Sequence, residues 1–185
     1  MEKLLFNNDK HPVSETGTAL AVFSTVLKKL SMVVIILLTA ASLHAQVIME
    51  LNDWLEQSKS SADPVMVSDA IHLEKLIKEL QPTVYIANTV IPNSGKQPVC
   101  ANAKPGYVDQ LSLENPLFSN VELLTIRLKS QADLNFILDL DKLTGFTNLK
   151  YVYFICEMNC NIEDVQKLFL PKSGITVFYK VSIPS

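Results

Sequence analysis

Two segments of the chain, 28 residues apart, share nearly the same pattern of apolar and polar residues. They are FSNVELLTIRL (118–128) and FTNLKYVYFIC (146–156), in which Phe and Asn are identical and most other positions match in kind. Both end in a run of β-branched, aromatic and leucine residues that is typical of a strand. The segment GITVFYKV (174–181) repeats the strand pattern about 25 residues later. Repetition with a period of 20–29 residues predicts stacked units that each hold one strand.

Strand and helix patterns alternate along most of the chain. The predicted order is helix, helix, strand, a long irregular loop at 88–115, strand, helix, strand, helix and strand. Parallel strands require crossover connections, so this order predicts an α/β domain over residues 46–185. Its sheet is expected to be mostly parallel, with about four short strands and the crossover helices on one side. The predicted strands are 83–87, 121–128, 148–155 and 174–183, and the predicted helices are 47–57, 68–80, 132–143 and 161–169.

The stretch LTGFTNLKYVYF (143–154) resembles one unit of a leucine-rich repeat. The L-x-x-L-x-L pattern of that family is matched twice, by Val121, Leu124 and Ile126 and by Leu149, Val152 and Phe154. The Asn that follows the strand in the family is absent, so the units at 116–181 resemble a degenerate form. The resemblance implies a cap formed by residues 47–80 and a sheet face that binds partner proteins. The alternative is a small α/β domain without true repeats.

Side chains that alternate along a strand point to opposite faces of the sheet. If Leu124 and Ile126 point towards the crossover helices, the opposite face is open and carries aromatic and cationic residues. Such residue types are enriched at the centres of protein interfaces. The predicted binding residues are Tyr85, Arg127, Tyr153, Phe178 and Lys180. The alternative is that the loop at 88–115 covers these side chains and forms a second core with them.

The first quarter of the chain has the features of a signal peptide. Lys28 and Lys29 precede the apolar run LSMVVIILLTAASL (30–43), and the small residue Ala45 lies just after it, so we expect a signal peptide over about 26–45 with cleavage after Ala45. The run is too short to span a bilayer. Its AQ ending resembles signal peptides of Bacteroidetes-type bacteria and implies a periplasmic, cell-surface or secreted protein. Residues 1–25 are expected to be a wrongly assigned extension, the alternative being a long n-region or a signal anchor.

The charge of residues 46–185 argues against nucleic acid as a partner. This part of the chain holds 12 Lys and Arg against 16 Asp and Glu, a formal net charge of −4. Nucleic-acid binding requires a concentrated basic surface, and none is evident. We therefore expect the partner to be another protein or a surface macromolecule.

The sequence contains no established catalytic motif, and we expect neither an enzyme nor a cofactor. No G-x-S-x-G, H-E-x-x-H, P-loop or G-x-G-x-x-G motif is present. The three cysteines, Cys100, Cys156 and Cys160, predict at least one disulfide in an exported protein, but their spacing leaves the pairing open. His72 would complete a Cys₃His set of zinc ligands, but the C-x-x-C spacing of a zinc site is absent, so no metal is expected. The alternative is a secreted enzyme or a metal site around the Cys100 loop.

Overall fold

The computed structural model describes residues 48–183, which belong to one compact unit spanning Gln46–Ser185. The predicted signal peptide and the residues before it lie outside the described part of the chain. Between residues 48 and 183, no helix has the length and apolar character needed to cross a membrane.

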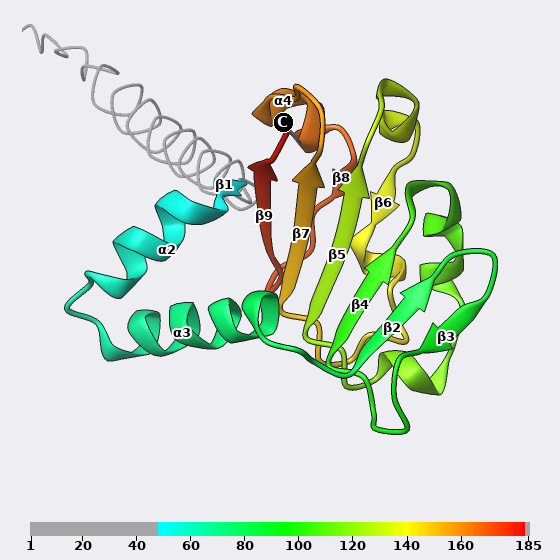
Figure 1. Ribbon diagram of the computed structural model, residues 1–185, viewed down its shortest axis with the longest axis horizontal. Helices are drawn as coiled ribbons and strands as arrows, with labels where there is room; N and C mark the ends of the chain where they lie inside the picture. The colour runs from blue at the N-terminus through cyan, green and yellow to red at the C-terminus, as the bar shows by residue number, and fades with distance from the viewer. Residues whose placement is uncertain (1–47, 184–185) are drawn as a thin grey trace, which may run out of the picture. The chain divides into compact units, whose positions relative to one another are not determined.

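The core of the fold is a seven-stranded sheet with the order β1-β9-β7-β5-β4-β2-β3 (Figure 1). All neighbouring strands are parallel except the β2–β3 pair, which is antiparallel. The predicted α/β class and the mostly parallel sheet are therefore confirmed, whereas the expected number of about four strands is too low. The strands are β1 (Met49–Glu50), β2 (Thr83–Ile86), β3 (Val90–Pro92), β4 (Cys100–Ala103), β5 (Leu123–Leu128), β7 (Tyr151–Cys156) and β9 (Thr176–Val181).

The 28-residue spacing in the sequence is the register of two neighbouring strands. Leu123 of β5 lies opposite Tyr151 of β7, and the same offset holds along the whole pair. The turns that precede the two strands also stack on each other. The rings of Phe118 and Phe146 have centroids 4.4 Å apart, and the Thr147 hydroxyl donates a 2.9 Å hydrogen bond to the Ser119 carbonyl. The two similar segments are thus stacked structural units.

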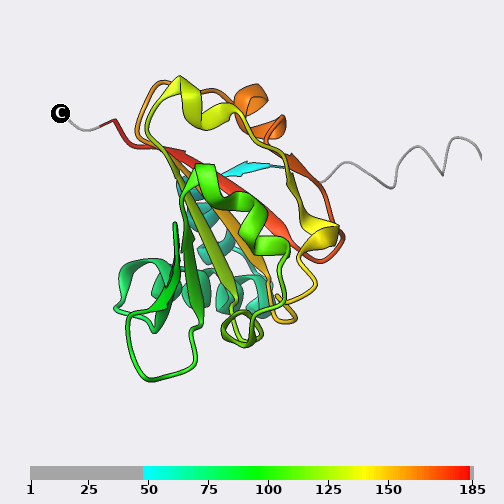
Figure 2. The same cartoon turned by 90° about the vertical axis from the view of Figure 1, so that its right-hand side faces the viewer.

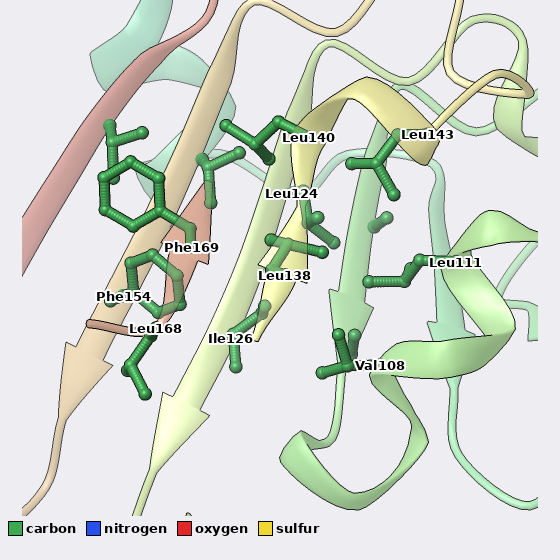
Figure 3. Close-up of a cluster of buried hydrophobic side chains, with 14 of the residues drawn as sticks. Val108, Leu111, Leu124, Ile126, Leu138, Leu140, Leu143, Phe154, Leu168 and Phe169 are labelled. Atoms are coloured by element: carbon green, nitrogen blue, oxygen red, sulfur yellow. The ribbon is translucent and has the colours of Figure 1, made fainter. Parts of the chain in front are cut away.

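The connections between β4, β5, β7 and β9 all pack on one face of the sheet. They consist mainly of single turns: the 3-10 helices η2 (Pro105–Ser112), η3 (Pro116–Phe118), η4 (Gln131–Leu134) and η5 (Leu140–Lys142), the helix α4 (Ile162–Gln166), and the short parallel strands β6 (Leu138–Asp139) and β8 (Phe169–Leu170). Their apolar side chains form the larger core with the inward residues of the strands, as predicted for Leu124 and Ile126 (Figure 3).

The helix predicted at 132–143 is absent because its apolar residues alternate. Leu134 and Phe136 pack partly against the core and Leu138 is buried in it, whereas Ile137 between them is 65% exposed. Alternation with a period of two places one face of an extended chain against the core, which a helix of 3.6 residues per turn cannot do. The helix predicted at 161–169 is shortened to α4, which the Asn161 and Asp164 side chains cap at its start.

The segment predicted as the irregular loop 88–115 contains two strands and a 3-10 helix. Strand β4 is a full member of the sheet, paired with β2 on one side and β5 on the other. Its sequence, CANA, lacks β-branched and aromatic residues, so it has no propensity signal of its own. Small side chains suit the position because Ala101 and Ala103 are buried in the same core as Val108 and Leu111 of η2.

The first two helices cover the face of the sheet that was expected to be open. Helix α2 (Leu51–Lys59) follows β1, whose Glu50 side chain caps it by accepting from the Asp53 amide, and α3 (Pro64–Lys78) leads to β2. Residues 47–80 therefore do not form a cap at the end of the repeat units. Figure 2 shows these helices on one side of the sheet and the turns of the connections on the other, so helical segments occupy both faces.

Candidate functional site

The five middle strands bring one row of outward side chains together across the sheet. In register, this row runs from Tyr85 through Asn102, Thr125 and Tyr153 to Phe178. Because parallel strands are hydrogen-bonded in register, residues far apart in the sequence become neighbours on one face. The row joins three of the predicted binding residues, but they do not have the same environment.

One half of this face is a second hydrophobic core. Phe178 is fully buried, with its ring centroid 4.9 Å from that of Trp54 on α2, and Tyr153 is 4% exposed. We call Tyr151, Tyr153 and Phe178, with the helices over them, the covered half-face. The expectation that Tyr153 and Phe178 lie on an open surface is wrong. The covering element is the α2–α3 pair, and not the loop at 88–115 that was considered as a cover.

The other half of the face remains accessible. Tyr85 on β2 is 48% exposed, and the Arg127 side chain on β5 is 56% exposed. With Asn102 and Thr125 between them, they form what we call the open half-face. Lys180, the fifth predicted residue, is half-buried on β9 beside Ile155 and does not line the clefts described next.

Two adjoining clefts meet at the open half-face and share its four residues. The larger, of about 570 Å³, extends over the carboxyl ends of β2, β4 and β5. The smaller, of about 190 Å³, runs between the sheet and the end of α3, where Leu80 is fully exposed. In open parallel sheets, ligands bind outside the carboxyl ends of the strands. The carboxyl ends of β2, β4 and β5 are accessible in the same way here.

Three cationic side chains line the larger cleft. Lys104 follows β4, Arg127 lies near the end of β5, and Lys129 follows that strand. Tyr85 and Tyr107 provide aromatic walls. Sequence reasoning identified Tyr85 and Arg127 but missed Lys104, because it lies after a strand that has no propensity signal.

A carboxylate already pairs with two of these cations. Arg127 donates to Glu157 Oε1 at 2.9 Å, and Lys129 Nζ lies 3.5 Å from Glu157 Oε2. The hydrogen bond from Arg127 lowers the pKa of the Glu157 carboxyl, and the positive charge of Lys129 adds to the effect. Glu157 therefore remains ionised at neutral pH.

Glu157 lies in the short loop that the Cys156–Cys160 disulfide closes. Cys156 at the end of β7 is bonded to Cys160, and the Glu157 amide donates a 2.7 Å hydrogen bond to the Leu128 carbonyl. The short loop thus holds the carboxylate at the rim of the open half-face. Of the pairings left open by the sequence, the structure contains Cys156–Cys160.

The environment of Cys100 does not favour catalysis. Its thiol is buried beneath α3, 3.6 Å from the Leu76 carbonyl, and burial raises its pKa to about 11, with the Glu122 charge adding to the effect. A reactive cysteine needs a thiolate near neutral pH.

The only histidine among the described residues does not belong to a metal site. His72 contacts the Glu122 carboxylate at 2.9 Å. Within residues 48–183 no cluster of three or more His, Cys, Asp or Glu side chains could hold a metal ion.

Comparisons with protein-family models, curated proteins and solved structures find no match for this chain.

Proposed function

We propose that the protein is an exported protein-interaction domain that binds its partner on the open half-face. The observation that carries the proposal is the contrast in exposure along a single row of the sheet, where Tyr85 remains half-exposed while Tyr153 and Phe178 are buried. Arg127, two residues beyond the row on β5, is also exposed and lines the same clefts as Tyr85. Exposed aromatic and Arg side chains around a cleft are the residues that contribute most to protein interfaces. Export is supported by the Cys156–Cys160 disulfide, since disulfides persist mainly in oxidising compartments.

We further infer that the stack of β4, β5, β7 and β9 is a degenerate leucine-rich-repeat-like array. Three features support this inference: each strand pairs with the next in the chain, the connections share one face, and β6 and β8 form a second parallel pair outside the main sheet. In such arrays the face opposite the connections is the usual partner surface. Here α2 and α3 would leave only its β2–β4–β5 part for binding.

Site-specific photo-crosslinking tests the proposed surface. A photoreactive phenylalanine analogue replaces Tyr85 in the full chain, and the matched control replaces Ile137, which is 65% exposed on the opposite side of the sheet. On irradiation in cell-envelope or culture fractions of the host, position 85 is expected to give a discrete protein adduct that position 137 lacks. Adducts of equal yield at both positions, or none at position 85, would contradict the proposal.

A further inference from the structure

We propose that the larger cleft recognises an acidic segment of the partner in which carboxylates flank an aromatic or apolar residue. This inference rests on the proposed interaction function and specifies the chemistry of the partner. It begins from the placement of Lys104, Arg127 and Lys129, which line one cleft although residues 46–185 carry a net negative charge. A local cationic cluster on an acidic protein selects partners of negative charge and speeds their encounter.

The carboxylates near the cleft leave part of this positive charge uncompensated. Asp133 accepts hydrogen bonds from the Lys129 and Ser130 amides, at 2.7 and 3.0 Å, and so caps η4. Glu157 is shared between Arg127 and Lys129. Among the described residues, no carboxylate lies within ion-pairing distance of Lys104.

Glu157 shows that the Arg127–Lys129 pair accepts a carboxylate. Its two oxygens contact the two cations separately, an arrangement that a carboxylate of the partner could reproduce. Its side chain belongs to the disulfide loop at the rim of the cleft. Glu157 therefore acts as an internal competitor, which the partner displaces or joins on binding.

The apolar part of the recognised segment follows from the smaller cleft. Leu80 is fully exposed and Tyr85 is 48% exposed, and both line this cleft beside Arg127. An aromatic or aliphatic side chain placed here would remove apolar surface from water on both sides. Carboxylates on either side of that residue would then reach the cations of the larger cleft.

The test uses three labelled random copolymers as probes: glutamate with tyrosine, lysine with tyrosine, and serine with tyrosine. Fluorescence anisotropy measures their binding to the full chain at low and high salt. We expect the glutamate–tyrosine copolymer to bind most tightly, with an affinity that falls as salt screens the charges. Equal binding of the serine–tyrosine copolymer, or preference for the lysine–tyrosine copolymer, would overturn the inference.

Two variants should change the affinity for the glutamate–tyrosine copolymer in opposite directions. Lys104→Ala combined with Lys129→Ala is expected to weaken binding of the glutamate–tyrosine copolymer about tenfold or more, because two charge-assisted contacts are lost. Glu157→Gln is expected to strengthen it several-fold, since the competing carboxylate is removed. Lys96→Ala is the matched control, as this exposed lysine lies outside both clefts.

The opposite sign for Glu157→Gln distinguishes recognition from a structural role. If Glu157 only positioned Arg127 and Lys129, its substitution would weaken binding, and that result would overturn the inference. Thermal unfolding of each variant checks that the fold is retained. A Tyr85 crosslink without preference for the acidic copolymer would leave the proposed function standing and refute only this inference, whereas acidic binding without a Tyr85 crosslink would refute the proposed surface.

Discussion

The covered and open half-faces are parts of one sheet surface, yet one is a core and the other is accessible. Tyr153 and Phe178 are buried beneath α2 and α3, whereas Tyr85 and Arg127 remain exposed around the cleft at the end of α3. In Figure 1, α2 leads away from β1 beside β9 and α3 returns next to it, so the helix pair stays on the β9 side and a loop continues to β2 near the opposite edge. A tyrosine that is exposed on β2 is therefore a packing residue on β7, three strands away in the same sheet.

The largest expected effect is the loss of stability when a buried side chain of the covered half-face is truncated. Phe178→Ala should lower the free energy of unfolding by about 3–5 kcal/mol, because it removes a fully buried ring and leaves a cavity against Trp54. Urea unfolding followed by the fluorescence of Trp54, the single tryptophan, measures this change. A loss below about 1 kcal/mol would mean that the helices do not pack on β9 as described.

Reduction of the disulfide should lower the free energy of unfolding by less than Phe178→Ala does. Its structural effect should be at the rim of the open half-face. The five-residue ring from Cys156 to Cys160 predicts a loss of about 2 kcal/mol in the chain-entropy treatment of crosslinks. Urea unfolding with and without a reductant gives the value. The Trp54 fluorescence of the folded protein should not change, because the covered half-face is not crosslinked. Cys100→Ala serves as the control and should show the same sensitivity to the reductant.

The contact between Glu122 and His72 should contribute about 1 kcal/mol to holding α3 on the sheet. Glu122 accepts from Lys150 at 2.8 Å and contacts His72 of α3 at 2.9 Å. Glu122→Gln is expected to increase the rate at which an alkylating reagent labels the buried Cys100 about fivefold, since α3 must open to expose this thiol. Glu157→Gln, which removes a carboxylate on another part of the sheet, should leave this rate unchanged.

The contribution of the Glu122 carboxylate to stability should decrease as the pH falls. Partial burial alone would raise the pKa of Glu122, but the hydrogen bonds from Lys150 and His72 outweigh it, and the pKa is lowered from 4.5. A group with a lowered pKa in the folded state stabilises fully above its unfolded value, and the contribution disappears as pH falls through the folded value. Wild type and Glu122→Gln should therefore differ at neutral pH and converge in acid. A constant difference would show that charge is not the cause.

The smallest effect on stability is expected at the open half-face. Tyr85→Ala should change the free energy of unfolding by no more than about 1 kcal/mol, because nearly half of the side chain is already exposed. The same urea experiment that reports Phe178→Ala measures it. If both substitutions destabilised the protein equally, the distinction between the two half-faces would be lost.

Much of the local structure could be predicted because alternation and spacing are visible in the sequence. The inward phase of Leu124 and Ile126, and the outward phase of Arg127, are as predicted. Strand β7 also carries a sequence signal for burial on both faces. The run YVYFIC of β7 has no charged side chain on either face and is buried throughout, as expected for a parallel strand covered on both sides. The corresponding strand β5 keeps Thr125 and Arg127 on its outward face.

The candidate site was harder to predict because two of its residues lie on or directly after β4, a strand without a propensity signal. Asn102 and Lys104 enter the site only once β4 is inserted between β2 and β5. Glu157 enters through a disulfide whose pairing the sequence left open. In each case the decisive contact joins residues that are distant in the chain or ambiguous in pattern.

By itself, the sequence determined the period of the units, the register of β5 on β7 and the alternation of side chains along each strand, because these depend on local spacing. Only the tertiary structure decided which outward residues are covered. The amphipathic pattern of 68–80 requires that its apolar side be buried, but it does not specify the surface that buries it. That surface is the β7–β9 half of the sheet together with Cys100 and Leu123 at the starts of β4 and β5. The carboxyl-end parts of β2, β4 and β5 remain accessible because α3 covers only the starts of β4 and β5.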